Sequence, residues 1–112
     1  MTVYGRRLTF RMEEHFGDGH ELRLALVGEL DVAVAKLFAQ RLSELRRGGY
    51  TVCLDLERLE FIDSSGLREL IREIDDSRRG GWRLEIDPRL SDPVRRVIEM
   101  VGAHSYFWPD GG

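Results

Sequence analysis

The stretch "LEFIDSSGLREL" (residues 59–70) leads from an apolar segment into a helical one. Its first half is typical of a loop that leaves a strand, and its second half is typical of a helix start. At the junction lie Asp63, Ser64 and Ser65, followed by Gly66. A helix start needs one capping side chain, and a Ser in that position contributes roughly 1 kcal/mol. The surplus of polar groups raises the question of whether one hydroxyl is presented to another molecule.

Two segments of alternating apolar and polar residues precede this junction, at residues 8–14 and 20–27. Such alternation is typical of strands with one buried face. Gly17 and Gly19 lie between the two segments and favour a tight turn. We therefore predict a β-hairpin, with Leu8 in its first strand.

A helix and a strand are predicted between the hairpin and the junction. Apolar residues recur at steps of three and four over residues 34–45. Asp31 is placed to cap this helix, and Gly48-Gly49 is placed to end it. The nearly all-apolar run "TVCLDL" (residues 51–56) predicts a strand covered on both faces. Cys53 should pack there as a small hydrophobic residue, and as the single cysteine it cannot form an intrachain disulfide.

The chain after the junction predicts further helices and strands. The second helix should end near Gly80-Gly81, and residues 82–86 should form another strand. Asp92-Pro93 begins a third helix, with the acid as its cap, and Gly102 lies just past its end. Residues 105–108 are expected to form a last short strand.

The predicted order of elements is β-β-α-β-α-β-α-β. Because helices follow strands after the hairpin, the later strands should be parallel and joined by right-handed crossovers. We predict an α/β fold, with a small mixed β-sheet and helices packed on one face. The length of 112 residues suits one domain over residues 1–112, with its core at about residues 8–108.

Composition argues against several classes of function. The net charge is −3, which gives no general case for direct binding to nucleic acid or to an anionic membrane. The sequence shows no signal peptide and no long apolar run, so a cytoplasmic location is expected.

Catalytic patterns are also missing. The "DSSG" stretch does not match the Gly-x-Ser-x-Gly nucleophile elbow, and the only histidines are His15, His20 and His104. The first two fall in the predicted hairpin turn, so no base is evident for a Ser nucleophile. The "WPD" stretch resembles the acid loop of tyrosine phosphatases. Those enzymes also need an Arg six positions after their catalytic Cys, and the residue six positions after Cys53 is Leu59. Without a phosphate loop or metal-ligand spacing, we predict no enzyme, no cofactor and no metal site.

Two features favour a function for the polar junction beyond capping. The junction follows a strand predicted to be central, so it should lie at the carboxyl edge of the sheet, where open α/β sheets tend to carry their sites. Gly66 should also leave the backbone uncovered for the approach of another molecule.

Three stretches together resemble a known family. These are "LDLERLEFIDSSGLREL" (54–70), "LVGELDVAVA" (26–35) and "PVRRVIEMVGAHSYF" (93–107). The first is similar to the signature of STAS domains, specifically the single-domain anti-sigma factor antagonists of bacteria. The other two are similar to that family's lead into its first helix and to its last helix. The resemblance spans about residues 8–108 and implies the architecture that the periodicity predicts.

The resemblance implies a phosphorylation switch at Ser64. The implied partner is an anti-sigma factor that also has GHKL-type serine kinase activity. Unphosphorylated antagonist would bind this partner and free the sigma factor, phosphorylation of Ser64 would break the complex, and a serine phosphatase would restore it. The chain would then be the substrate of an enzyme and not an enzyme.

Further residues are expected around Ser64. Asp31 and Asp63 should help to present Ser64 and contact the kinase or its nucleotide, although both can equally be helix caps. Ser65 would be a cap or a hydrogen-bond partner. Glu29 and Gly66 are the other residues expected to contact the partner. Gly66 can instead have a structural role.

Two other functions are compatible with the sequence. Some single-domain STAS relatives support the ATPase subunit of a lipid-transport ABC complex, which would use the same helix end. A nucleotide-binding enzyme or weak NTPase is a third interpretation, and the missing phosphate loop argues against it.

Overall fold

The computed structural model describes residues 2–7 and 9–111, and of residues 2–7 it describes the backbone. Leu8, expected in the first hairpin strand, lies outside the described residues, as do the two ends of the predicted domain, Met1 and Gly112. The strands are β1 (Thr2–Arg7), β2 (Phe10–Phe16), β3 (Glu21–Leu30), β4 (Thr51–Leu56), β5 (Leu59–Ile62) and β6 (Leu84–Leu90). The helices are α1 (Val32–Arg47), α2 (Ser64–Gly80), α3 (Asp92–Met100) and α4 (His104–Phe107).

The strands form one mixed sheet in the order β1-β2-β3-β4-β6. The predicted hairpin is confirmed as the antiparallel pair β2 and β3, and β1 adds an antiparallel edge strand that the sequence did not predict. Strands β4 and β6 are parallel to β3, as expected. Strand β5, expected to be a loop, pairs in parallel with the last residues of β3, beyond the part that β4 occupies.

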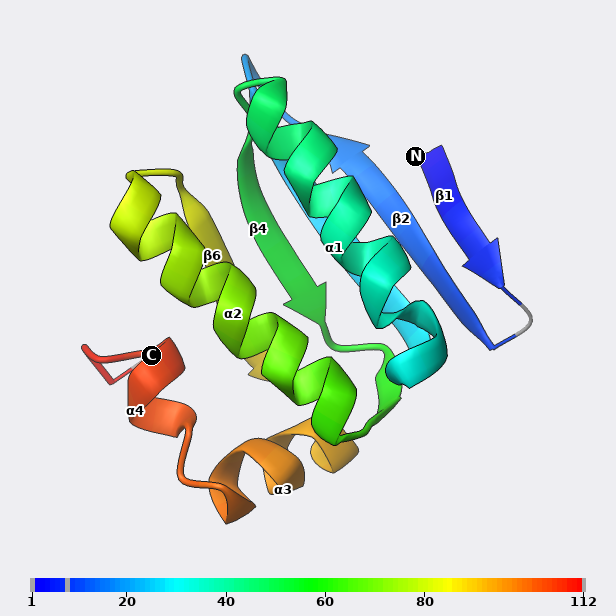
Figure 1. Cartoon of the computed structure of the whole chain (residues 1–112), viewed down its shortest axis with the longest axis vertical. Coiled ribbons are helices and arrows are strands. Elements are labelled where there is room, and N and C mark those ends of the chain that lie inside the picture. The colour runs from blue at the N-terminus through cyan, green and yellow to red at the C-terminus, as the bar shows by residue number, and fades with distance from the viewer. Residues whose placement is uncertain (1, 8, 112) are drawn as a thin grey trace.

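Helices α1 and α2 lie side by side over one face of the sheet, and both begin at the same edge (Figure 1). This edge is the carboxyl edge, because β3 leads into α1 and β5 leads into α2. Helix α3 packs against β5 at this edge. The apolar stripes of the helices and the inward residues of the strands form one core, which confirms an α/β fold with helices on one face.

The opposite face of the sheet is open, which corrects the expectation that β4 is covered on both faces. Val52, Leu54 and Leu56 are fully buried, whereas Cys53 and Asp55, which alternate with them, are only half-buried. The sequence "TVCLDL" looks nearly all apolar because Cys53, which resembles a small apolar residue, occupies one of the outward positions of the strand. Cys53 therefore does not pack in the core.

The chain end differs from the expected last strand. Residues 104–107 form a short helix, α4, and the following Trp108 is buried. Its indole N–H donates a hydrogen bond to the carbonyl oxygen of Ile86 at 2.7 Å. The predicted last strand at residues 105–108 is therefore wrong, and this segment contacts β6 through a side chain. Helix α3 also begins one residue early, with Ser91 and not Asp92 at its N-cap position.

Candidate functional site

The carboxylate of Asp63 caps two helices at once. One oxygen accepts a hydrogen bond from the backbone N–H of Gly66 in α2 at 2.8 Å. The other accepts from the backbone N–H of Val32, the first residue of α1, at 3.2 Å. Since each helix start has backbone donors without helical partners, Asp63 ties the two starts together.

Asp31 and Asp63 are brought together by strand pairing. Leu30 pairs with Ile62 across β3 and β5, so the residues that follow them leave the sheet side by side. Asp31 caps its own helix, accepting a hydrogen bond from the backbone N–H of Ala33 at 3.0 Å. The predicted capping roles of both acids are confirmed.

The two serines are not used for capping. Ser64 is exposed and Ser65 is half-buried. Among the described residues, neither hydroxyl has a hydrogen-bond partner, while Asp63 occupies the capping position of α2. The surplus of polar groups at this junction therefore leaves the Ser64 hydroxyl directed to solvent at the start of a helix.

Gly66 is buried, which corrects the expectation of an uncovered backbone. A Cβ atom at this position would collide with the carbonyl oxygen of Leu30 and lie 3.0 Å from the side chain of Ile62. The glycine is thus needed for the close approach of α2 to the end of β3. Its expected role in partner contact stays a prediction.

Two apolar side chains near the helix starts are exposed. Val32 is 71% exposed at the start of α1, and Phe61 is 48% exposed on β5, two residues before Asp63. Glu29, opposite Phe61 in the pairing of β3 with β5, is half-buried. Neither Val32 nor Phe61 was recognised from the sequence. The periodicity of apolar residues indicates which side chains share a face of a helix or strand, but it does not show which parts of that face another element leaves uncovered.

A cleft of about 400 Å³ runs between α1 and α2 beside Ser65. Its α1 wall is apolar apart from Lys36, and its α2 wall is charged, with Arg72 paired to Glu69 at 3.0 Å. One turn further along α2, burial and the neighbouring Glu69 carboxylate raise the pKa of Glu73 to about 8. The residues lining the cleft are Val32, Ala35, Lys36, Ala39, Ser65, Arg68, Glu69 and Arg72.

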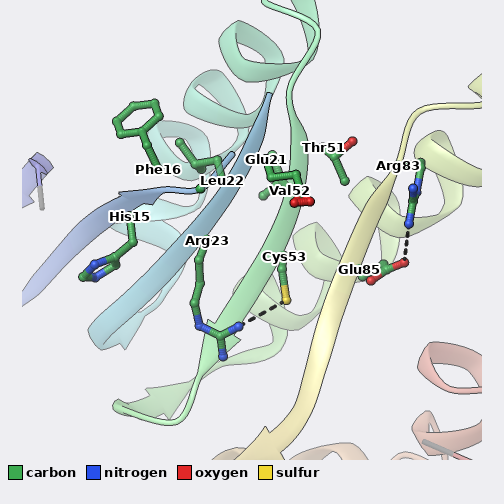
Figure 2. A pocket seen from close by; sticks show the side chains of 11 residues that line it. His15, Phe16, Glu21, Leu22, Arg23, Thr51, Val52, Cys53, Arg83 and Glu85 are labelled. Carbon is green, nitrogen blue, oxygen red and sulfur yellow. Dashed lines mark hydrogen bonds and ion pairs between the residues drawn. The ribbon is translucent and has the colours of Figure 1, made fainter. Parts of the chain in front are cut away.

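A second hollow, of about 450 Å³, lies on the open face of the sheet and contains none of the expected site residues. Figure 2 shows Arg23 directed at the sulfur of Cys53, 3.6 Å from it. The same guanidinium pairs with Asp87 at 2.7 Å and with Asp55 at 3.2 Å. Burial raises the pKa of the Cys53 thiol, so this sulfur is not activated as a nucleophile.

Searches for two other kinds of feature are negative within residues 2–7 and 9–111. No group of three His, Cys, Asp or Glu side chains there has the arrangement of a metal site. No helix in the same residues has the length and apolar character needed to cross a membrane.

The family model described as "Mlab, STAS domain" matches residues 17–106. The chain belongs to the STAS domain family. The match includes α1, β5, the Asp63–Gly66 junction and α3, so the family assignment rests on the same segments as the site. A search of curated proteins finds no match.

Solved STAS structures share this fold. An anti-sigma factor antagonist from Mycobacterium paratuberculosis is 20% identical, with a TM-score of 0.71 over 89% of this chain and 84% of that one. The anti-sigma factor antagonist SpoIIAA in its unphosphorylated form is 24% identical, with a TM-score of 0.66 over 81% and 80%. The phosphorylated form of the Bacillus cell fate determinant SpoIIAA is 23% identical, with a TM-score of 0.61 over 81% and 83%. At these identities the likeness establishes the fold.

Proposed function

We propose that this STAS domain is an anti-sigma factor antagonist controlled by phosphorylation of Ser64. The unphosphorylated form binds an anti-sigma factor with GHKL-type serine kinase activity and thereby releases a sigma factor. Phosphorylation abolishes this binding, and a serine phosphatase restores it. In this scheme the chain acts in the cytoplasm as a kinase substrate and catalyses no reaction itself.

One observation carries the proposal. The Ser64 hydroxyl is exposed and has no hydrogen-bond partner among the described residues, although it stands at a helix start where serines usually cap. Asp63 does the capping for two helices, so Ser64 can be modified without loss of a structural bond. Structures of SpoIIAA in unphosphorylated and phosphorylated forms share the fold, which also supports the proposal.

The chemistry is a single phosphoryl transfer. Ser64 Oγ attacks the γ-phosphorus of ATP bound to the partner kinase, and an O–P bond forms as the bond from that phosphorus to the β,γ-bridging oxygen breaks. ADP leaves, and the hydroxyl proton passes to a base of the kinase. The product carries about −1.5 to −2 charges and three acceptor oxygens at the start of α2, where the helix dipole tolerates negative charge.

The effect on the partner follows from desolvation. The exposed Val32 side chain stands at the helix start whose N–H binds Asp63, the residue before Ser64, so a partner that covers this helix start would lie close to Ser64. Burying a phosphate dianion without a counter-ion costs several kcal/mol, which is enough to abolish a complex of micromolar affinity at about −8 kcal/mol. The switch therefore requires no large change of shape.

The test is a pull-down from lysate of the source cells, with mass spectrometry of the retained proteins. The baits are the unmodified domain, Ser64→Ala, Ser64→Asp and, as a matched control, Ser105→Asp at an exposed serine of α4. We expect a GHKL-type kinase on every bait except Ser64→Asp. Retention of a transporter ATPase by all four baits would instead indicate the lipid-transport function.

Titration against the isolated kinase then measures the switch directly. We expect Ser64→Ala to stay folded and bind constitutively, and Ser64→Asp to bind at least about tenfold more weakly. Equal binding of the Ala and Asp variants would contradict the proposal.

A further inference from the structure

Two cations in the cleft between α1 and α2 have no partner in the fold. Most arginines of the described chain pair with carboxylates or pack on aromatic rings. Within residues 9–111, Lys36, Arg68 and Arg96 have no hydrogen bond, ion pair or ring contact. Lys36 and Arg68 line the same cleft, from opposite walls, together with Ser65.

The helix geometry directs Arg68 toward Ser64. The two residues are four apart in α2, and side chains at this spacing lie on the same side of a helix. Long helical side chains also lean toward the N-terminus of their helix, which brings the Arg68 guanidinium back over the first turn. Lys36 lies in the second turn of α1, whose start is tied to that of α2 by Asp63.

We propose that Arg68, assisted by Lys36, binds the phosphate of phosphorylated Ser64 within the same chain. This inference rests on the proposed phosphorylation of Ser64. An acidic group four residues before a basic one is the favourable order in a helix, and a guanidinium can bind two phosphate oxygens at once. Arg72, one turn further along, already pairs with Glu69 and is not needed.

The binding has a consequence for the switch. A phosphate held by Arg68 and Lys36 lies across the mouth of the cleft and neutralises its two free cations. Phosphorylation then changes the surface twice, by adding a charged group at Ser64 and by closing the cleft beside it. A partner that uses either feature loses it in the phosphorylated form.

The experiment measures the phosphate itself. Phosphoserine is introduced at position 64 during translation, without a kinase, in the unchanged chain and in Arg68→Gln, Lys36→Gln and Arg96→Gln. Phosphorus NMR then follows the second pKa of the phosphate, ordinarily about 6. A nearby cation favours the dianion and lowers this pKa.

We expect the phosphate pKa to rise by about half a unit or more in Arg68→Gln relative to the unchanged chain, and by less in Lys36→Gln. Arg96→Gln is the matched control, since Arg96 is equally unpaired but does not line the cleft, and it should cause no shift. In Arg68→Lys the phosphate pKa should lie between the values of the unchanged chain and of Arg68→Gln. Lysine retains the charge but cannot bind two phosphate oxygens at once.

An unchanged phosphate pKa in Arg68→Gln would overturn the inference, and an unchanged value in Lys36→Gln would remove Lys36 from the site. Neither result depends on a partner, because the phosphoserine is installed without one. Failure of the proposed function would appear separately, as the absence of a kinase in the pull-down.

Discussion

The carboxyl edge of the sheet and its open face use their charges in different ways. On the open face, Arg23 pairs with both Asp55 and Asp87, and Arg58 pairs with Glu13 at 2.6 Å. At the carboxyl edge, the Ser64 hydroxyl and the cation of Arg68 have no partner among the described residues. The open face is thus complete without another molecule, whereas the edge retains groups that a ligand or partner can bind.

The ion pairs of the open face take the place of a second layer of helices. Strand β3 lies between β2 and β4, and the Arg58–Glu13 pair spans it. Ala25 and Val27 of β3 are 2% and 9% exposed, although no helix of the described residues crosses this face. Long charged side chains can cover apolar surface with their stems, so this face is structural. A pocket on a surface with satisfied charges is therefore a weaker candidate site than a cleft of similar volume that retains unsatisfied ones.

The largest expected effect tests the close packing of α2 against the end of β3 at the carboxyl edge. Gly66→Ala should destabilise the domain by about 3 kcal/mol, because the new methyl group meets the backbone of Leu30, which cannot move aside. Gly80→Ala in the same helix is the control, since its methyl group meets only the mobile guanidinium of Arg46. It should be neutral or stabilising by up to about 1 kcal/mol. Urea unfolding measures both, and a Gly66→Ala variant as stable as Gly80→Ala would show that helix propensity decides and not the close approach.

The next effect separates the two acids of the edge. Asp63→Ala removes bonds to two helix starts and should cost about 2 kcal/mol, whereas Asp31→Ala removes one and should cost about 1 kcal/mol. Thermal unfolding of the two variants and their double mutant measures the difference. A larger cost for Asp31→Ala would contradict the assignment of Asp63 as the shared cap.

The smallest effect tests the open face through its pH dependence. The hydrogen bonds from Arg89 and Arg23 hold the pKa of Asp87 well below its usual range. A lowered pKa in the folded state adds stability that is present above the unfolded value near 4 and is lost as the pH falls below it. Asp87→Asn should therefore cost about 1 kcal/mol at pH 7 and progressively less below pH 4.

Glu85→Gln provides the control for that titration. Glu85 lies two residues away on the same strand, is mostly exposed, and pairs with Arg83 only at 3.4 Å. Its replacement should leave stability within about 0.5 kcal/mol at both pH values. A loss in Asp87→Asn that is the same at pH 7 and pH 3 would mean that the ion pairs do not stabilise the open face.

Local signals were sufficient for much of the fold. The caps at Asp31 and Asp63 and the helix ends at Gly48 and Gly81 were read correctly, because they depend on residues within one turn. The period-two pattern located β2 and β3 for the same reason. The junction around Ser64 could be singled out because it holds more polar groups than one helix start requires.

Other features depend on neighbours that are distant in the chain. Residues 104–107 form α4 where a strand was expected at 105–108, and Trp108 is buried with its indole N–H bonded to Ile86, 22 positions earlier in the chain. Glu13 and Glu14 are buried within β2, which no hydropathy pattern predicts, since Arg58 pairs with Glu13 and Arg41 of α1 pairs with Glu14 from distant parts of the chain. The role of Gly66 likewise depends on the end of β3.

The amino-acid sequence by itself determined the β2–β3 hairpin, helices α1 to α3, strands β4 and β6, the family signature and the candidate phosphorylation residue, because periodicity, caps and motifs are properties of short stretches. Only the tertiary structure decided which polar group at the junction is used. The pairing of β3 with β5 brings the start of α1 within reach of Asp63, and this carboxylate then serves two helices. Ser64 has no hydrogen bond among the described residues, because its neighbour Asp63 occupies the capping position of α2.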